Sequence, residues 1–134
     1  MIQRVQTVWL FLIAVLSGLL QFMPITERVN SENFSTFFPF ETIFMIENGV
    51  IAILAIITIF LYKNRPLQIK LSQGLLVLLG LSCATIAYYI WTSPTDIIYK
   101  YPIVFPIIAI IFNLLAIFSI KKDERLVRSL DRLR

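Results

Sequence analysis

The sequence predicts an all-α fold: an integral membrane four-helix bundle of two antiparallel helical hairpins, followed by a C-terminal cytoplasmic amphipathic helix. The first reason is composition, because 58% of the 134 residues are hydrophobic and the mean hydropathy is +0.83, above ordinary soluble domains. The second is length. A helix of about 20 residues crosses a hydrocarbon core of about 30 Å, and four apolar windows reach it: residues 5–23, 42–62, 71–91 and 102–120.

Each window is expected to be helical. A single strand in lipid leaves its backbone groups unpaired, and the continuous apolar runs lack the alternation of a membrane barrel. The first window follows Arg4 and has no small-residue cleavage site after it, so it is interpreted as a retained anchor. Residues 1–120 are therefore expected to form a four-transmembrane-helix domain, and residues 121–134 a basic amphipathic cytoplasmic tail.

The connections between windows define the order of packing. The loops 63–70 and 92–101 are short, so the windows on either side of each should be antiparallel neighbours. Pro102 suits a helix start, where its missing N–H costs nothing. Pro106 lies about one turn further on, so a bend or an irregular first turn is expected there.

Positive charge is unevenly divided when the windows are threaded alternately across a membrane. One side receives only Arg28 and Lys100. Because basic residues are retained on the cytoplasmic side, both termini of this multi-pass membrane protein should be cytoplasmic. The other side receives ten basic residues, which are candidate contacts for a partner or for lipid headgroups: Arg4, Lys63, Arg65, Lys70, Lys121, Lys122, Arg125, Arg128, Arg132 and Arg134.

Residues suited to metal binding or catalysis are scarce. Histidine is absent, and Cys83, the only cysteine, lies inside the third window. We therefore expect neither a metal site nor a cofactor on this chain. No nucleophile with its base, phosphate loop or paired carboxylates is recognisable, so we expect a protein that is not an enzyme.

Glu47 is the most anomalous residue of the windows, since an ionisable group inside a span is a functional candidate. Asn48 follows it directly, and Asn113 in the fourth window is its expected polar neighbour. These three residues form a candidate intramembrane polar site. Either Glu47 is structural, near the headgroups or protonated and bonded to another helix, or it binds a proton or cation.

Small residues recur at helical spacing in three windows. The pairs are Ala14 with Gly18, Gly80 with Ala84, and Ala109 with Ala116 around Asn113. Such residues allow the backbones of two helices to approach closely, so helix packing is their expected role.

The connection between the first two windows carries four phenylalanines, Phe34, Phe37, Phe38 and Phe40. They are candidate outer-surface contacts. Their rings either rest on the outer membrane surface or dock onto another protein.

The tail places Leu126, Val127, Leu130 and Leu133 at helical spacing among charged residues. It is expected to form an amphipathic helix, whose simplest placement is along the anionic membrane surface. A nucleic-acid partner is not expected, because acidic residues dilute the basic ones and no aromatic residue is present for base stacking.

Three segments together resemble a known family. They are residues 1–8 (MIQRVQTV), the loop Tyr62-Lys63-Asn64-Arg65 with Gln68, and residues 120–134 (IKKDERLVRSLDRLR). The chain resembles domain of unknown function 4293, an uncharacterised family of bacterial membrane proteins. The resemblance implies a four-helix inner-membrane protein of a Bacteroidota-type bacterium and implies no activity.

The segments that carry the resemblance all fall on the expected cytoplasmic side. They favour a docking surface over a reaction site. The leading hypothesis is a non-catalytic accessory or scaffold subunit of a larger inner-membrane complex, whose partners are the lipid bilayer and other membrane proteins or further copies of the chain. The alternative is a small oligomeric transporter or channel that uses Glu47 and Asn113.

Overall fold

The computed structural model describes residues 3–23, 26–28, 38–92 and 97–131, and four helices dominate them. The helices are α1 (Gln3–Leu19), α2 (Phe38–Phe60), α3 (Arg65–Thr92) and α4 (Phe105–Asp131). Two three-residue strands, β1 (Thr26–Arg28) and β2 (Ile97–Tyr99), and the 3-10 helix η2 (Tyr101–Val104) complete the described elements. The predicted all-helical class is confirmed.

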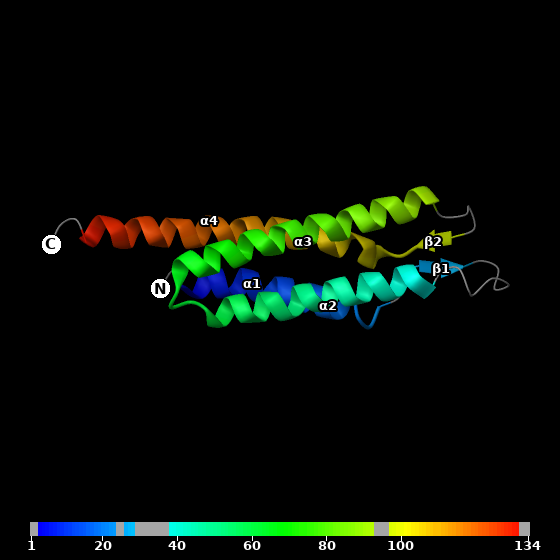
Figure 1. Ribbon diagram of the computed structural model, residues 1–134, viewed down its shortest axis with the longest axis horizontal. Coiled ribbons are helices and arrows are strands. Elements are labelled where there is room, and N and C mark those ends of the chain that lie inside the picture. Colours follow the sequence, from blue (N-terminus) through cyan, green and yellow to red (C-terminus); the bar gives the residue numbers. More distant parts are fainter. Residues whose placement is uncertain (1–2, 24–25, 29–37, 93–96, 132–134) are drawn as a thin grey trace.

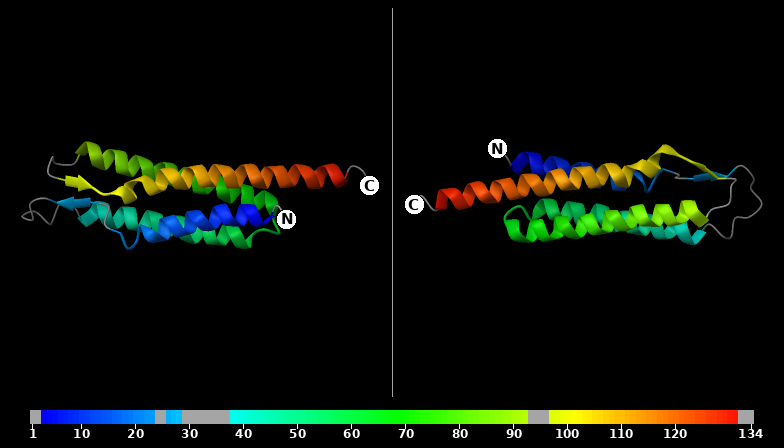
Figure 2. Two further views of the ribbon diagram at one scale, coloured as in Figure 1. Left: turned by 180° about the vertical axis from the view of Figure 1, so that it is seen from behind. Right: turned by 90° about the horizontal axis from the view of Figure 1, so that it is seen from above.

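The helices lie side by side, with α1 against α2 and α4, and with α3 against the same two helices. Figures 1 and 2 show α1 and α4 in one layer and α2 and α3 in the other. We call the end that holds the α2–α3 turn and the start of α1 the turn end. The opposite end, which holds β1 and β2, is the strand end. The last part of α4 continues past the other helices at the turn end (Figure 1).

Three helices are long and apolar enough to cross a membrane, and they occupy Thr42–Lys63, Arg65–Thr92 and Tyr101–Val127. These three correspond to the second, third and fourth sequence windows. The first window extended to residue 23, but α1 ends at Leu19 and turns follow it. Its 17 residues give about 26 Å of helix at 1.5 Å per residue, slightly less than a hydrocarbon core.

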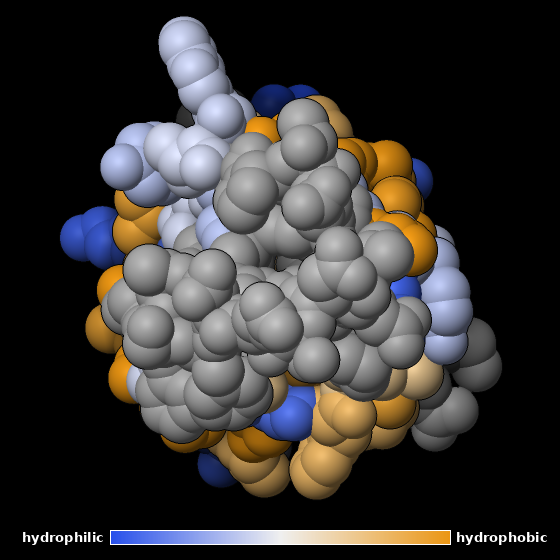
Figure 3. Space-filling model, turned by 90° about the vertical axis from the view of Figure 1, so that its right-hand side faces the viewer, coloured by the Kyte–Doolittle hydropathy of each residue, from blue (hydrophilic) through white to orange (hydrophobic). Residues whose placement is uncertain are grey.

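The bundle is apolar outside and partly polar inside. Val77, Phe60 and Phe118 are among the large side chains that point outward, each at least 66% exposed. Asn48, Ser72 and Asn113, by contrast, are completely buried. Figure 3, viewed from the strand end, shows apolar side chains around much of the coloured rim. This distribution suits a lipid environment, where an outward apolar surface costs nothing and polar groups need partners within the protein.

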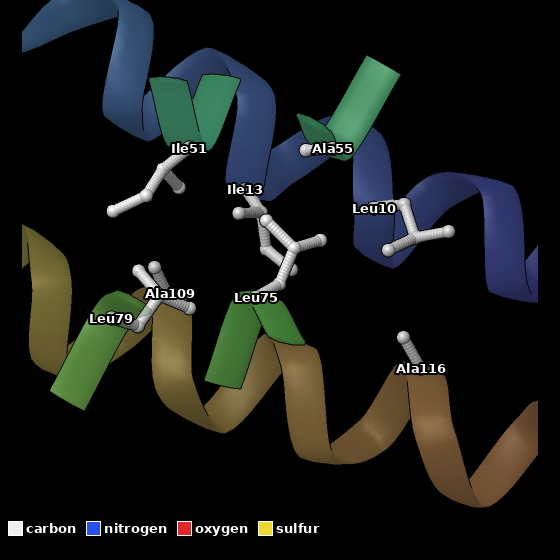
Figure 4. Close-up of a cluster of buried hydrophobic side chains, with 8 residues drawn as sticks. All are labelled: Leu10, Ile13, Ile51, Ala55, Leu75, Leu79, Ala109 and Ala116. Atoms are coloured by element: carbon white, nitrogen blue, oxygen red, sulfur yellow. The ribbon is translucent and has the colours of Figure 1, made fainter. Parts of the chain in front are cut away.

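The centre of the bundle is a cluster of side chains from all four helices (Figure 4). Ala116 of α4 faces Leu10 of α1, and small residues at such positions let two backbones approach. Trp9 packs beside Phe112, with ring centroids 5.5 Å apart. Towards the strand end a second cluster continues the packing. The central cluster consists of Leu10, Ile13, Ile51, Ala55, Leu75, Leu79, Ala109 and Ala116.

The predicted packing role of the small residues holds for only some of them. Ala109 and Ala116 are buried as expected. Gly80 and Ala84 lie instead on the exposed face of α3, and a Cβ added at Gly80 would meet nothing within 4 Å. Packing against another helix of the same chain is therefore the wrong interpretation for this pair.

The strands β1 and β2 join the two helical hairpins at the strand end. They pair antiparallel, with Thr26 opposite Tyr99 and Arg28 opposite Ile97. Tyr99 also meets Tyr89 of α3 edge to face, at 6.4 Å between ring centroids. Because the two strands are far apart in the sequence and only three residues long, periodicity along the chain did not indicate them.

Proline sets the start of the last helix as predicted. Pro102 lies in the first turn of η2, and the α-helix begins only at Phe105. The irregular first turn expected near Pro106 is thus confirmed, because a residue without an N–H is tolerated where helical bonding has not yet begun.

The tail is not a separate helix as far as the structure describes it. Residues 121–131 continue α4 without a break. Leu126 and Val127 are 46% and 41% exposed, and their helix runs on beyond the bundle (Figure 2). The amphipathic helix expected for the tail is therefore, in the described residues, the continuation of the fourth helix and not a separate element.

The close contact of α1 with α4 predicts a steric effect at Ala116. Changing Ala116→Leu should overpack the interface and lower the free energy of unfolding by about 1–3 kcal/mol. Ala87→Leu, on the exposed face of α3, is the matched control and should have little effect. Unfolding in mixed detergent micelles measures both, and equal losses for the two variants would contradict the packing described here.

Candidate functional site

The polar side chains inside the bundle form three layers along its length. One lies at the turn end, one near the middle, and one towards the strand end. The sequence indicated only some of their residues, namely Glu47, Asn48 and Asn113. The sequence interpretation missed Gln6, Gln68, Ser72, Ser82 and Thr85.

The turn-end layer joins α1, α3 and α4. Gln6 Nε2 donates a hydrogen bond to Asp123 Oδ2 at 2.5 Å. Arg65 Nη1 donates to the backbone carbonyl of Asp123 at 3.3 Å. Gln6 and Asp123 are 5% and 6% exposed, so this carboxylate is held inside the protein and not among solvated tail charges.

The same layer closes the turn between α2 and α3. The last carbonyls of a helix have no partner within it. Gln68 Nε2 donates to one of them, the Thr58 carbonyl, at 3.2 Å. The Thr58 hydroxyl donates back to Leu54 O at 2.7 Å. Gln68 therefore ties the start of α3 to the end of α2.

Exposed basic side chains surround this layer. Lys63, Lys70, Lys121, Lys122 and Arg125 are all exposed, and Arg65 is half-buried. The Lys63 ammonium lies 6.0 Å from the centre of the Tyr62 ring. The structure thus brings six of the ten candidate basic residues to the turn end. Arg132 and Arg134 lie outside the described residues, and only the backbones of Arg4 and Arg128 are described.

The middle layer links α3 to α4 through one amide. Asn113 Nδ2 donates to the Ser72 carbonyl at 2.9 Å. That carbonyl also belongs to the α3 ladder, and a carbonyl oxygen has two lone pairs. Asn113 therefore acts as an inter-helix tie, although its own Oδ1 and the Ser72 hydroxyl have no partner among the described residues.

The strand-end layer lies between α2 and α3. Thr85 Oγ1 is 3.4 Å from Glu47 Oε2, and Asn48 Nδ2 is 3.4 Å from Ser82 Oγ. Asn48 Nδ2 also donates to Phe44 O at 2.9 Å. Glu47 is half-buried and Asn48 is fully buried.

The expected pairing of Glu47 with Asn113 is wrong within one chain. Asn113 bonds to α3 at Ser72, whereas Glu47 meets α3 at Thr85. The 13 helical positions between these two contacts correspond to about 20 Å along α3. Spacing within a single helix could not show this, because it does not say which level of the neighbouring helix each residue meets.

The structure describes little of the aromatic outer segment. Phe34 and Phe37 lie outside the described residues, and only the backbones of Phe38 and Phe40 are described, in the first turn of α2. Within residues 3–23, 26–28, 38–92 and 97–131, no group of three or more His, Cys, Asp or Glu side chains is placed to hold a metal ion.

Comparison with known proteins identifies the family. The sequence matches the model of DUF4293, a domain of unknown function, over residues 2–133. The chain belongs to the DUF4293 family. No curated protein and no solved structure matches it. The resemblance found in the terminal segments is thereby confirmed over nearly the whole chain. Three helices of this DUF4293 chain are long and apolar enough to cross a membrane.

The bond between Gln6 and Asp123 predicts a graded stability loss. Asp123→Leu should lower the free energy of unfolding by about 1–3 kcal/mol, because the buried Gln6 amide loses its acceptor. Asp123→Asn keeps an acceptor oxygen and should cost less. Glu124→Leu, the neighbouring carboxylate, is the control. If Asp123→Leu were no worse than Glu124→Leu in detergent unfolding, the bond would not stabilise the fold.

Proposed function

We propose that this DUF4293 protein is a non-catalytic accessory or scaffold subunit of a larger bacterial inner-membrane complex. In this proposal all four helices span the membrane and both termini lie in the cytoplasm. The surface that docks onto a partner is the turn end, formed by the start of α1, the α2–α3 turn and the final part of α4.

One observation carries the proposal: three segments distant in the sequence are held together at the turn end by one buried and one partly buried hydrogen bond. Asp123 accepts from Gln6 of α1 and from Arg65 at the start of α3. A solvated tail needs no such anchoring. The bonds fix the direction in which α4 leaves the bundle, so the exposed basic side chains around it form a surface of defined shape.

The orientation follows from the same surface. Lys63, Lys70, Lys121, Lys122 and Arg125 are exposed at the turn end. Basic residues near the ends of spans are retained on the cytoplasmic side during insertion. Placing the turn end in the cytoplasm satisfies this rule for all five.

The transporter or channel alternative gains less support. It needs Glu47 and Asn113 on a shared path, whereas they contact α3 at Thr85 and Ser72. Asn113 is completely buried between α3 and α4. In one chain the two residues therefore belong to separate layers.

The orientation predicts a labelling pattern. In a Cys83→Ser background, Lys100→Cys should react with a membrane-impermeant maleimide on intact spheroplasts, because Lys100 follows β2 at the strand end. Lys122→Cys should react only after the membrane is permeabilised. The opposite pattern would place the turn end outside, and reaction of both sites before permeabilisation would rule out the proposed arrangement.

The docking role predicts loss of partners on truncation. Deleting residues 126–134 should abolish co-purification of a stoichiometric partner from native membranes while leaving membrane insertion intact. The reason is that the final part of α4 projects past the other helices (Figure 1). Affinity purification in mild detergent with quantitative mass spectrometry measures this.

A charge variant at the opposite end supplies the control for that truncation. Lys100→Ala removes a basic residue at the strand end and should leave co-purification unchanged. If the truncated chain kept the same companions in the same ratio, or if the full chain had none, the scaffold proposal would be wrong.

A further inference from the structure

Four oxygen-bearing side chains gather between α2 and α3 near the strand end. Glu47 and Asn48 are consecutive residues of α2, and Ser82 and Thr85 are three positions apart on α3. Residues three apart share one face of a helix. The two hydroxyls therefore face α2 together, opposite a carboxylate and an amide.

The protons available at these groups do not satisfy their oxygens. A threonine hydroxyl has one proton, and Thr85 Oγ1 donates it to Leu81 O at 2.9 Å. The contact of Thr85 Oγ1 with Glu47 Oε2 is longer, at 3.4 Å, and exceeds the usual range of about 2.5–3.0 Å for a hydrogen bond between oxygens. The contact therefore joins two oxygen atoms without a proton between them, because the Thr85 hydroxyl proton is donated to Leu81 O.

Two further oxygens in the same cluster are unpaired. Glu47 Oε1 and Asn48 Oδ1 are buried atoms without a hydrogen-bond partner among the described residues. Asn48 is 0% exposed, and its amide nitrogen already contacts Phe44 O and Ser82 Oγ. An unpaired buried oxygen is costly, and a carboxylate in lipid is more so. The cluster has an excess of acceptors and a deficit of positive charge.

We propose that this cluster is a binding site for a small monovalent cation such as Na⁺. Its ligands are the Glu47 carboxylate and the hydroxyl oxygens of Ser82 and Thr85, and Asn48, whose amide nitrogen faces Ser82 Oγ, positions that hydroxyl. A cation coordinates several oxygens at once, whereas a proton on Glu47 would serve only one acceptor. An all-oxygen donor set suits a hard cation. A single carboxylate balances one positive charge, and a divalent ion would leave an uncompensated charge in lipid.

The site is independent of the proposed docking role, because it lies at the strand end and the docking surface at the turn end. It implies no flux of the ion across the membrane. Its effect is to stabilise the contact of α2 with α3, since a ligand that binds only the folded state shifts the unfolding equilibrium.

Thermal unfolding of the purified full chain in detergent tests the proposal. Ionic strength is kept constant while NaCl replaces N-methyl-D-glucamine chloride, and unfolding is followed by intrinsic tryptophan fluorescence. The unfolding temperature should rise by several degrees with Na⁺ concentration and then saturate. Absence of any Na⁺-specific rise would overturn the proposal.

Three variants locate the effect. Glu47→Gln and Thr85→Val should abolish the Na⁺-dependent rise, whereas Glu124→Gln, a carboxyl at the turn end, should keep it. Persistence of the rise in Glu47→Gln would place the ion elsewhere and overturn the assignment. If Na⁺ did not change the unfolding temperature of the wild-type protein, and the wild-type protein and Glu47→Gln unfolded at the same temperature, Glu47 would be a protonated acid without a bound ion. That result would also overturn the assignment.

A direct measurement of Na⁺ binding to the wild-type protein tests the proposal even if the variants fail to fold. Equilibrium binding of radioactive Na⁺ to the wild-type protein should saturate at one ion per chain and be displaced by excess unlabelled Na⁺. Excess N-methyl-D-glucamine should not displace the radioactive Na⁺. No saturable binding would refute the site without reference to any variant.

Discussion

The whole structure depends on one constraint, which is that lipid offers no hydrogen-bond partner to a polar group. Helices satisfy their backbones internally, but each polar side chain must find a partner in the protein. Several amides do so through the backbone of a neighbouring helix: Gln68 at Thr58 O, Asn113 at Ser72 O and Gln21 at Met45 O. Such bonds are worth only about 1 kcal/mol each in lipid. They matter mainly because each bond sets the position of one helix along the axis of its neighbour.

Close packing makes these matches possible. Ala109 and Ala116 are the small residues where α4 meets the central cluster, and a short side chain there lets α1 approach. The approach brings Gln6, near the start of α1, to Asp123, about two turns beyond Ala116 on α4. The position of the tail is thus determined partly by contacts in the middle of the bundle. A change of volume at Ala116 and a change of polarity at Asp123 act on the same interface.

The sequence predicts what depends on composition and local spacing. Apolar length indicates α2, α3 and α4, and proline indicates the irregular start of α4. The sequence could not predict features that depend on contacts between segments distant along the chain. The outward position of Gly80, the level at which Asn113 meets α3, and the pairing of Thr26 with Tyr99 all require knowing which segments lie side by side. Gln6 and Gln68 carried a usable signal, since a glutamine at the edge of an apolar run must bond to something.

The end of α4 poses a physical question that the rest of the bundle does not. In the proposed membrane arrangement, lipid covers the outward apolar residues of the spans, so their exposure costs nothing. Leu126 and Val127 lie beyond Asp123, the last buried residue described on α4. The span-length helix Tyr101–Val127 includes both residues, but in the proposed arrangement they follow the charged residues 121–125 and lie outside the hydrocarbon, where each exposed CH₂ group costs about 0.8 kcal/mol relative to burial. A helix that runs straight on cannot fold back onto the membrane to cover them. Under the docking role proposed above, the same rigidity that anchors α4 through Gln6 and Arg65 makes a protein partner a better cover for this face than the lipid surface.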